Sequence, residues 1–481
     1  MQPLISIRER NLNGNAKAEA KRLIGHSQNR EGPVIRGARG VSKARFNAAH
    51  VAWAAMFCSI LIWGFRDARA AGLGDTGNWY RIALVLFAGI LGMYAVLRNT
   101  SRLARGFDGP LLLFLLYGLL AMISSAYIPT YSLYSMWKGL EVVIDVIVIA
   151  AVLTYPEPIA SARLAYKILI ALFGMLLLTY SIEALVVPSA ALAPSRGFVP
   201  FTMSGVLPIM NGNALAFLSA VVAFGAFCNL LRTRNSFRRV LALIIFAWTM
   251  TVLILAQSRT SLVGLVVAIC AFLLLDRRFG WLALIVALTI MVAALTSFVD
   301  VAQQYVIRGQ SKELFTSLSG RTQAWEAAWR LFLQSPLFGH GFAAAARVEI
   351  LGTGGRAAST LHGSIFDVMV GVGLLGLLPW AAAILWTMVL AFRSARRGQA
   401  MLRNAMITRS STAEMSGLLL LILVRGSTSS GLAMHDHDFM LFLTVVAFFV
   451  TASRAALRPG PAALASRSHP SEPVRMPQGA R

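Results

Sequence analysis

Three polar side chains stand at the edges of long apolar segments, where a membrane helix has no need of them. Arg259 lies in the stretch LAQSRTSLVG, Arg321 begins an aromatic-rich segment, and His362 precedes the apolar run that starts at Ser364. A guanidinium group binds phosphate or diphosphate oxygens in pairs through its planar fork. An imidazole accepts a proton from a hydroxyl group. These residue types suit a reaction in which a hydroxyl is activated and a phosphate leaves.

Each of the three residues also has an interpretation that requires no ligand. An arginine at a membrane surface can extend toward the lipid headgroups, and a histidine at a helix end can be an ordinary interfacial residue. However, Arg321 would begin a helix, where a cation is placed unfavourably relative to the helix dipole. Arg259 has no acidic residue near it in the sequence. We therefore favour an anion as the common partner of the two arginines.

The composition identifies the scaffold that must position these residues. The chain of 481 residues is 57% hydrophobic and 13% charged, which is too apolar for a soluble protein of this length. A span needs about 20 mainly apolar residues, and backbone hydrogen bonding inside lipid makes each such span a helix. We predict an all-α polytopic membrane protein with twelve spans near 47–65, 79–97, 109–128, 139–155, 164–186, 209–230, 238–257, 261–275, 281–299, 364–391, 413–431 and 438–453.

The basic residues indicate orientation rather than a nucleic-acid partner. The formal net charge is +24, but the arginines concentrate in the tails and in alternate short loops, as the positive-inside rule requires. We therefore expect both termini in the cytoplasm and no binding of nucleic acid. The expected division is a basic tail over residues 1–45, a transmembrane domain over 46–455 and a disordered tail over 456–481.

The segment 300–363 interrupts the series of spans and is predicted to be a long periplasmic loop between the ninth and tenth. Apolar side chains recur there at three- and four-residue spacing, at Trp325, Trp329, Phe332 and Leu333. Pro336 follows where a helix should stop. The pattern predicts an amphipathic helix with one aromatic face, suited to the lipid headgroup zone. A helix that caps the bundle without binding a ligand is the alternative.

Neither a metal nor a cofactor is expected. The three cysteines, Cys58, Cys228 and Cys270, lie inside predicted spans without metal-ligand spacing, and no carboxylate cluster stands out. Three further charged residues, Glu141, Asp145 and Lys167, fall inside the fourth and fifth spans. They either pair with one another, which makes them structural, or mark an ion path.

Four stretches, in order, resemble the O-antigen ligase and polymerase superfamily of bacterial envelopes. They are RGFVPFTMSGVLPIMNGNALAF, AQSRTSLVG, SGRTQAWEAAWRLFLQSPLFGHGF and LHGSIFDVMVGVGLLGLL, within 196–380. The resemblance implies that Arg259 and Arg321 hold a diphosphate, and that His362 acts beside the acceptor hydroxyl as base or orienting group. Asn213, from the Asn-x-Asn pattern, and Arg425 are further candidates for substrate binding.

The same resemblance implies a metal-independent glycosyltransferase of the bacterial inner membrane with its active site facing the periplasm. Such enzymes transfer a glycan from an undecaprenyl-diphosphate carrier, in contact with membrane lipid, to build lipopolysaccharide or exopolysaccharide. A ligase uses a lipid A-core or another envelope acceptor, and a polymerase uses a second lipid-linked glycan. Both use the same donor, so the sequence leaves this choice open.

The chain departs from the family pattern directly after the histidine. Gly363 stands where the family commonly has asparagine, so the hydrogen bond expected to position the sugar is open to question. An acidic residue expected near the last outer loop is either Asp436 or Asp438 in MHDHDFM. His340 in FGHGF occupies a position expected to vary.

Two further expectations concern the packing of the tenth span and the competing class of protein. Gly371, Gly373 and Gly376 are expected to let a neighbouring helix approach closely. A transporter or flippase of lipid-linked glycans would also suit twelve spans, with Glu141, Asp145 and Lys167 as coupling groups. Such proteins place their binding groups near the midplane of two matching halves. The chain shows no such halves, and its unusual charges lie at the outer edge, which favours the transferase.

Overall fold

The structure, a computed structural model, describes residues 46–63, 79–127, 132–195, 199–295, 304–305, 321–344, 361–396 and 407–457. All of these residues belong to one compact unit that extends from Arg45 to Arg481. The predicted terminal tails and most of the predicted loop between 296 and 360 lie outside the described residues.

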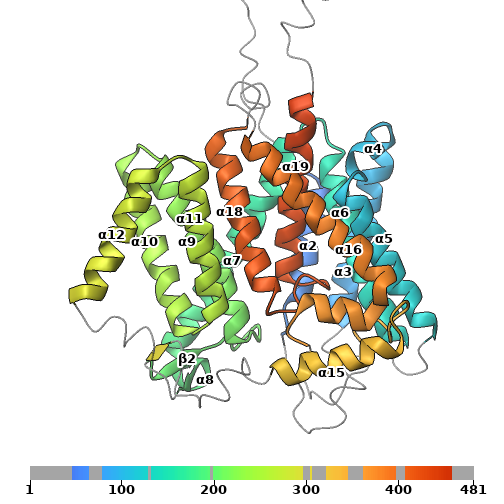
Figure 1. Ribbon diagram of the computed structural model, residues 1–481. Coiled ribbons are helices and arrows are strands. Elements are labelled where there is room, and N and C mark those ends of the chain that lie inside the picture. The colour runs from blue at the N-terminus through green and yellow to red at the C-terminus, as the bar shows by residue number, and fades with distance from the viewer. Residues whose placement is uncertain are drawn as a thin grey trace, which may run out of the picture. The chain divides into compact units, whose positions relative to one another are not determined.

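The described part of the chain is helical almost throughout (Figure 1). Each predicted span coincides with a helix, and these are α2 (Ala48–Ile60), α3 (Trp79–Arg98), α5 (Pro110–Ile123), α6 (Ser132–Leu153), α7 (Pro158–Val186), α9 (Gly212–Arg232), α10 (Ser236–Leu255), α11 (Arg259–Leu275), α12 (Phe279–Leu295), α16 (Ser364–Arg396), α18 (Arg409–Gly426) and α19 (His437–Leu457). The shorter helical elements are η2 (Thr100–Arg102), α4 (Leu103–Gly106), η3 (Ser124–Tyr127), α8 (Pro188–Ala191) and α15 (Arg321–Gln334).

Among the described residues, seven helices are long and apolar enough to cross a membrane. They are α3, α5 with η3, α7, α9, α10, α16 and α19. The other candidates fall short for two physical reasons. Helices α2, α11 and α12 are shorter, and α6 and α18 each carry three charged residues. A multi-pass protein is therefore confirmed, while twelve spans remain a prediction.

One small hairpin departs from the all-α prediction. Strand β1 (Leu192–Pro194) pairs antiparallel with β2 (Phe201–Met203), and Leu192 lies opposite Met203. The buried amide of Gln257 donates hydrogen bonds to the carbonyl oxygens of Val199 at 3.1 Å and Phe201 at 2.9 Å. Three-residue strands are too short to show an alternating pattern, so the sequence could not predict them.

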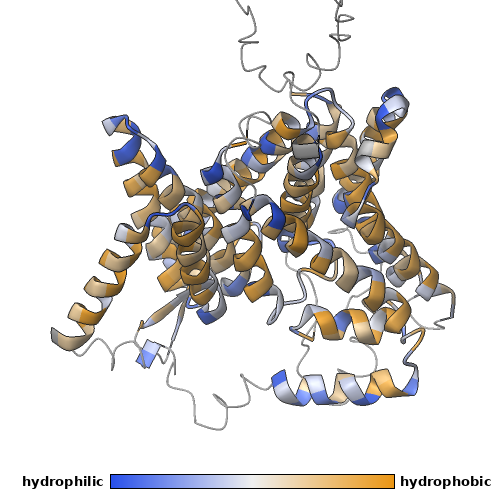
Figure 2. Cartoon of the chain, turned by 45° about the horizontal axis from the view of Figure 1, so that its top comes forward, coloured by the Kyte–Doolittle hydropathy of each residue, from blue (hydrophilic) through white to orange (hydrophobic). Residues whose placement is uncertain are grey.

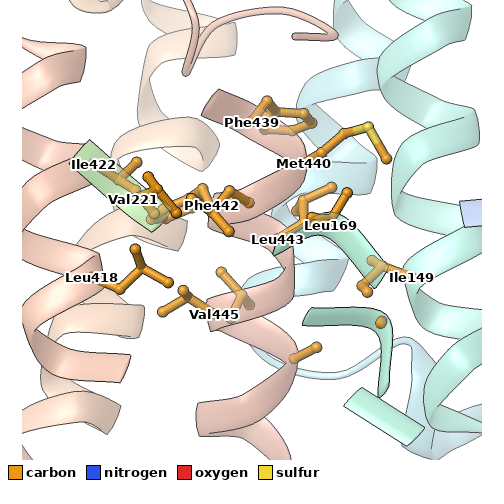
Figure 3. Close-up of a cluster of buried hydrophobic side chains, with 14 of the residues drawn as sticks. Ile149, Leu169, Val221, Leu418, Ile422, Phe439, Met440, Phe442, Leu443 and Val445 are labelled. Atoms are coloured by element: carbon orange, nitrogen blue, oxygen red, sulfur yellow. The ribbon is translucent and has the colours of Figure 1, made fainter. Parts of the chain in front are cut away.

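Helices α9 and α19 form the centre of the bundle. In an apolar 18-residue stretch of each helix, 83% of the residues are buried. In α10 the corresponding share is 22%. Figure 3 shows the α19 side chains of Phe439, Met440, Phe442 and Leu443 packed among residues of neighbouring helices. The long helices carry hydrophobic residues along most of their length (Figure 2). The apolar side chains that α10 exposes are therefore suited to lipid rather than to water.

Helix α16 is broken at Gly373, whose φ is +64°. The segment that follows α15 supplies hydrogen bonds at the break: the His340 amide donates to the Val370 oxygen at 2.7 Å, and the Gly341 amide to the Gly371 oxygen at 2.9 Å. A Cβ at Gly373 would collide with the carbonyl of Leu337. The expectation that a neighbouring helix approaches here was wrong, because the turns that follow α15 do so instead.

The third glycine of this span has a different environment. A Cβ at Gly376 would collide first with Val372 of its own helix, at 2.5 Å. The close approach of a neighbouring helix at Gly376 stays a prediction.

Helix α15 ends at Gln334, before Pro336, as predicted, but its apolar residues do not share one face. Phe332 is buried, whereas Trp329 is 49% exposed and Leu333 is 58% exposed. The Trp325 ring stacks on Phe366 with their centroids 5.2 Å apart. The helix therefore caps the start of α16 with one side and presents an apolar strip on the other. The contact with the bundle agrees with the capping alternative, and the position in the lipid headgroup zone stays a prediction.

Candidate active site

Arg259 is placed by a tight turn between α10 and α11. Gln257 adopts a left-handed backbone conformation with φ of +51°, and Ser258 precedes Arg259, the first residue of α11. The next residue, Thr260, accepts a hydrogen bond from the Thr428 hydroxyl at 3.0 Å. Because Thr428 lies in the turn after α18, this bond holds the start of α11 against the end of α18.

Arg425 lies in the last turn of α18 and is 7% exposed. Its Nε lies 3.6 Å from the Asp438 Oδ2, and its Cζ lies 5.9 Å from the centre of the Phe217 ring. A buried guanidinium requires an anionic partner, and Asp438 supplies it. The structure therefore brings Asp438, of the two acidic candidates, to this arginine.

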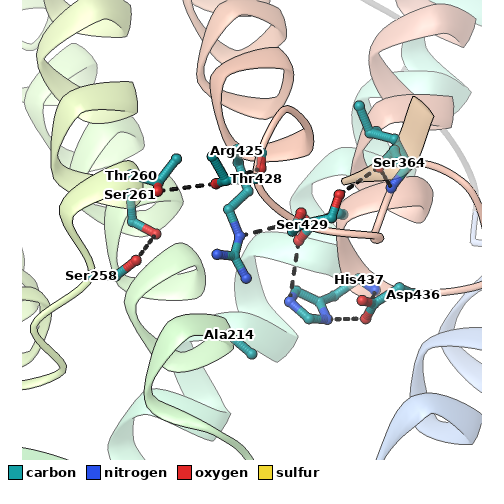
Figure 4. A network of polar contacts seen from close by, with 12 residues as sticks. Ala214, Ser258, Thr260, Ser261, Ser364, Arg425, Thr428, Ser429, Asp436 and His437 are labelled. Atoms are coloured by element: carbon teal, nitrogen blue, oxygen red, sulfur yellow. Dashed lines mark hydrogen bonds and ion pairs between the residues drawn. The ribbon is translucent and has the colours of Figure 1, made fainter. Parts of the chain in front are cut away.

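His437 connects both acidic candidates in one polar network (Figure 4). Its Nε2 lies 3.2 Å from the Asp438 Oδ1, and its Nδ1 contacts the Asp436 carboxylate. The two carboxylates beside the ring favour the charged form of the imidazole. The formal charges of Asp436, His437, Asp438 and Arg425 therefore sum to zero.

His362 lies in the turn before α16, with φ of +52°. Two residues later, the Ser364 hydroxyl donates to the Ser429 oxygen at 2.7 Å and accepts from the Leu432 amide at 3.1 Å. On the other side, the Trp325 indole donates to the Leu361 oxygen at 3.0 Å. These bonds fix the histidine turn between α15 and the loop after α18.

The surroundings of His362 favour its neutral form. The residue is exposed, yet the desolvation of its ring lowers the pKa of the imidazole, and the positive charges of Arg321 and Arg425 lower this pKa further. A neutral imidazole can accept a proton at neutral pH. The geometry and the charge of the site therefore both permit His362 to act as a base.

Arg321, the first residue of α15, joins the same centre. Desolvation lowers the pKa of its guanidinium, and the charges of Arg425 and Arg259 lower it further, which requires the three arginines to lie near one another. Within the described residues, no carboxylate forms an ion pair with Arg321. The structure thus brings together Arg259, Arg321, His362 and Arg425, and their combined charge attracts an anion.

The family comparison covers the segments that carry three of these four residues. Residues 244–381 match the family model described as O-antigen ligase. This match supports the O-antigen ligase and polymerase superfamily as the family of the matched segment. The match runs from α10 to α16 and contains Arg259, Arg321 and His362, whereas Arg425 and Asp438 lie beyond it. No curated protein matches the chain.

The family match, together with the apolar helices, implies a multi-pass membrane protein of bacteria. It also implies an enzyme of surface glycan synthesis that uses a lipid-linked glycan and an acceptor.

Asn213 belongs to the same end of the helical bundle, outside the matched residues. Asn211 caps α9, because its side chain accepts a 2.9 Å hydrogen bond from the Ala214 amide, and Asn213 is exposed in the first turn. One turn further along α9, Phe217 contacts both His437 and Arg425. The exposed position leaves the side-chain amide of Asn213 accessible, whereas the side chain of Asn211 caps α9.

Trp325 occupies the space that the family's asparagine would need. A Cβ at Gly363 would lie 3.2 Å from the Trp325 Nε1 and 3.1 Å from the Phe366 ring. His340 has a structural contact nearby, because its Nε2 bonds to the Leu331 oxygen at 2.8 Å. The departure at Gly363 thus accompanies a tryptophan packed over the histidine turn.

The charged residues inside the helices do not pair with one another. Glu141 pairs with Lys138 of its own helix at 2.6 Å, and Asp145 pairs with His435 at 2.7 Å. Lys167 is exposed on α7. Of the two alternatives for Glu141, Asp145 and Lys167, the pairing with one another was therefore wrong. Glu141 uses a neighbour in its own helix, and the sequence could not indicate that the distant His435 reaches Asp145.

Sequence reasoning also missed three residues that organise the site. These are Ser364, Thr428 and His437, and each acts through a contact between segments far apart in the chain. The run of alternating acidic residues and histidines in MHDHD was the available signal for His437.

Proposed function

We propose that this protein transfers a glycan from undecaprenyl diphosphate to an acceptor hydroxyl at the periplasmic face of the bacterial inner membrane. The convergence of Arg259, Arg321 and His362 carries the proposal, because a diphosphate leaving group and a hydroxyl nucleophile need these side chains together. The reaction is metal-independent in this proposal, since arginines supply the positive charge.

The proposed step is a displacement at the anomeric carbon of the donor glycan. The acceptor oxygen forms a bond to that carbon, and the bond from the carbon to the diphosphate oxygen breaks. His362 takes the proton from the acceptor hydroxyl and releases it after transfer. Arg259 and Arg321 bind the oxygens of the departing undecaprenyl diphosphate, whose negative charge grows as the bond breaks.

Arg425 and Asn213 complete the proposed donor site. Asp438 holds Arg425 at a fixed position through the 3.6 Å ion pair, so the guanidinium is already oriented before a phosphate oxygen binds. Asn213 is exposed at the start of α9 and is suited to a sugar hydroxyl. Of the two acidic candidates, we assign Asp438 to the support of Arg425.

The orientation in the membrane follows from the distribution of the arginines. Basic residues gather at the helix ends away from the site, including Arg98 at the end of α3, Arg238 at the start of α10 and Arg396 at the end of α16. The positive-inside rule places these ends in the cytoplasm. Both termini are then cytoplasmic and the site faces the periplasm.

The flippase alternative has less support once Glu141 and Asp145 have partners, because coupling groups need access to an ion. Ligase and polymerase remain the two forms of the proposed activity, with lipid A-core or a second lipid-linked glycan as acceptor.

The test is a reaction in proteoliposomes with a defined undecaprenyl-diphosphate glycan and each acceptor in turn. We expect a covalent product with one acceptor, detected by its mass, and that acceptor distinguishes ligase from polymerase. Movement of the donor across the bilayer without any product would support the flippase and contradict the proposal.

A further inference from the structure

A second buried polar chain lies beside the candidate site. The Asp145 Oδ2 is 2.7 Å from the His435 Nδ1, and the His435 Nε2 is 2.9 Å from the Ser59 Oγ. The three residues come from α6, from the loop before α19 and from α2. Asp145 and Ser59 are 0% exposed and His435 is 4% exposed, so water does not separate the three side chains.

The order of contacts matches that of a hydrolytic triad, but the hydrogen bonding excludes a nucleophilic serine. The Ser59 hydroxyl donates its single proton to the Met56 oxygen at 2.7 Å. Its oxygen must therefore accept from His435, whereas an activated nucleophile donates to its histidine. The Ser59 backbone oxygen also accepts from the Arg81 Nε at 2.6 Å, which holds the residue in place.

The same argument shows that both ring nitrogens of His435 are engaged. Nε2 carries a proton because it donates to Ser59, and a further proton lies in the short bond to Asp145. The pair of His435 and Asp145 is neutral overall, and the contact between them is a charge-assisted hydrogen bond. Removal of either partner leaves a buried polar group without its hydrogen bond. We expect the loop that carries His435 to shift in response.

The loop that His435 holds is the loop that supports Arg425. His435 stands two residues before His437 and three before Asp438, the partner of Arg425. The two histidines face opposite sides, one toward α6 and the other toward the site. The carbonyl of Ala433 is held as well, by the Tyr117 hydroxyl at 2.6 Å.

We propose that Asp145, His435 and Ser59 form a positioning unit that sets the place of Asp438 and Arg425 relative to the donor diphosphate. The inference rests on the proposed function, because it assigns the diphosphate to Arg425. None of the three residues touches the substrate. They act through the backbone of residues 435–438, so their effect on transfer depends on Arg425.

The test measures transfer with Asp145→Asn, His435→Gln and the milder Ser59→Ala. We expect the first two to lower kcat/KM for the donor by about ten- to a hundredfold, since small displacements of binding groups have effects of this size. In an Arg425→Gln background, Asp145→Asn should cause little further loss, because residues that act as one unit are not additive. Independent, fully additive losses would overturn the inference.

His50→Gln is the matched control. His50 is also a buried histidine of α2, and its Nε2 contacts the Ser161 oxygen at 3.1 Å. It stands nine residues before Ser59, about 13 Å along the helix. At equal amounts of folded protein, His50→Gln should transfer at the wild-type rate. Wild-type transfer by Asp145→Asn would overturn the inference as well.

A second measurement separates this inference from the proposed function. A cysteine at the exposed Ser427 reports on the loop without any reaction, and its alkylation rate is followed at that residue by peptide mass. Asp145→Asn should accelerate the alkylation, and His50→Gln should not. An unchanged rate overturns the positioning unit, whereas an accelerated rate in a protein without transferase activity overturns only the function.

Discussion

The hydroxyl of Thr428 donates a 3.0 Å hydrogen bond to the hydroxyl of Thr260, a residue more than 150 positions earlier in the sequence. Thr260 follows Arg259 directly, and Thr428 lies three residues after Arg425. This bond holds the start of α11, which carries Arg259, against the turn that follows Arg425. It also links the O-antigen ligase match, which ends at residue 381, to a segment beyond it.

Replacement of His362 should abolish transfer without preventing donor binding. General-base assistance is commonly worth about 100- to 10,000-fold, so His362→Ala should lose at least that factor in kcat. The arginines remain, so binding of the lipid-linked glycan should persist. A purified assay with defined donor and acceptor measures both quantities. Full turnover by His362→Ala would show that the histidine is only an interfacial residue.

Arg259 should depend on the shape of its side chain as well as on its charge. Arg259→Lys keeps the charge but loses the paired contact to a diphosphate, and a charged hydrogen bond is worth about 1.5–3 kcal/mol. Transfer should therefore fall about tenfold or more. Arg238→Lys, at an exposed position at the start of α10, is the control and should transfer normally.

The pH dependence of kcat/KM should reflect the lowered pKa of His362. A base acts only when deprotonated, so activity should rise with pH through this pKa, at a pH below the ordinary imidazole value of about 6.5. Arg321→Gln removes a nearby positive charge and should move the acidic limb of its residual activity to higher pH. Arg330→Gln, exposed on the same helix, should leave the limb in place. If the acidic limb of Arg321→Gln matched that of the wild type, the charge of Arg321 would have no effect on the pKa of His362.

Restoration of the family's asparagine should be harmful in this chain. Gly363→Asn forces a side chain against Trp325 and Phe366, and such overpacking costs about 1–3 kcal/mol. We expect a lower unfolding temperature and reduced transfer. Trp325→Leu combined with Gly363→Asn should recover part of both, because it removes the larger obstacle. If Gly363→Asn alone behaved as the wild type, the close packing of the histidine turn would have no consequence.

Cysteines at Ser427 and Ser236 should react with a membrane-impermeant reagent from opposite sides. Both residues are exposed, Ser427 after α18 on the site side and Ser236 at the start of α10 near the basic turn. We expect Ser427→Cys to react from the periplasm and Ser236→Cys only after the membrane is opened. Reaction of both from one side would contradict the proposed orientation.

The sequence by itself determined the helical membrane scaffold, because an apolar run of span length has only one way to satisfy its backbone in lipid. It also determined α15, whose spacing and following proline are local signals, and the candidates Arg259, Arg321 and His362, whose residue types are improbable at their positions. The number of spans could not be decided from the sequence, because α6 and α18 carry more charged residues than an apolar membrane helix normally contains.

Only the tertiary structure decided which distant residues meet. Glu141 pairs with Lys138 three residues away in α6, a spacing that the sequence contains, whereas Asp145 meets His435 only because α6 packs against the loop before α19. The same packing selected Asp438 over Asp436 for Arg425, and it filled the break in α16 with the segment after α15. Hydrogen bonds and ion pairs act over a few ångströms, and residues hundreds of positions apart come within that range only once the helices have packed.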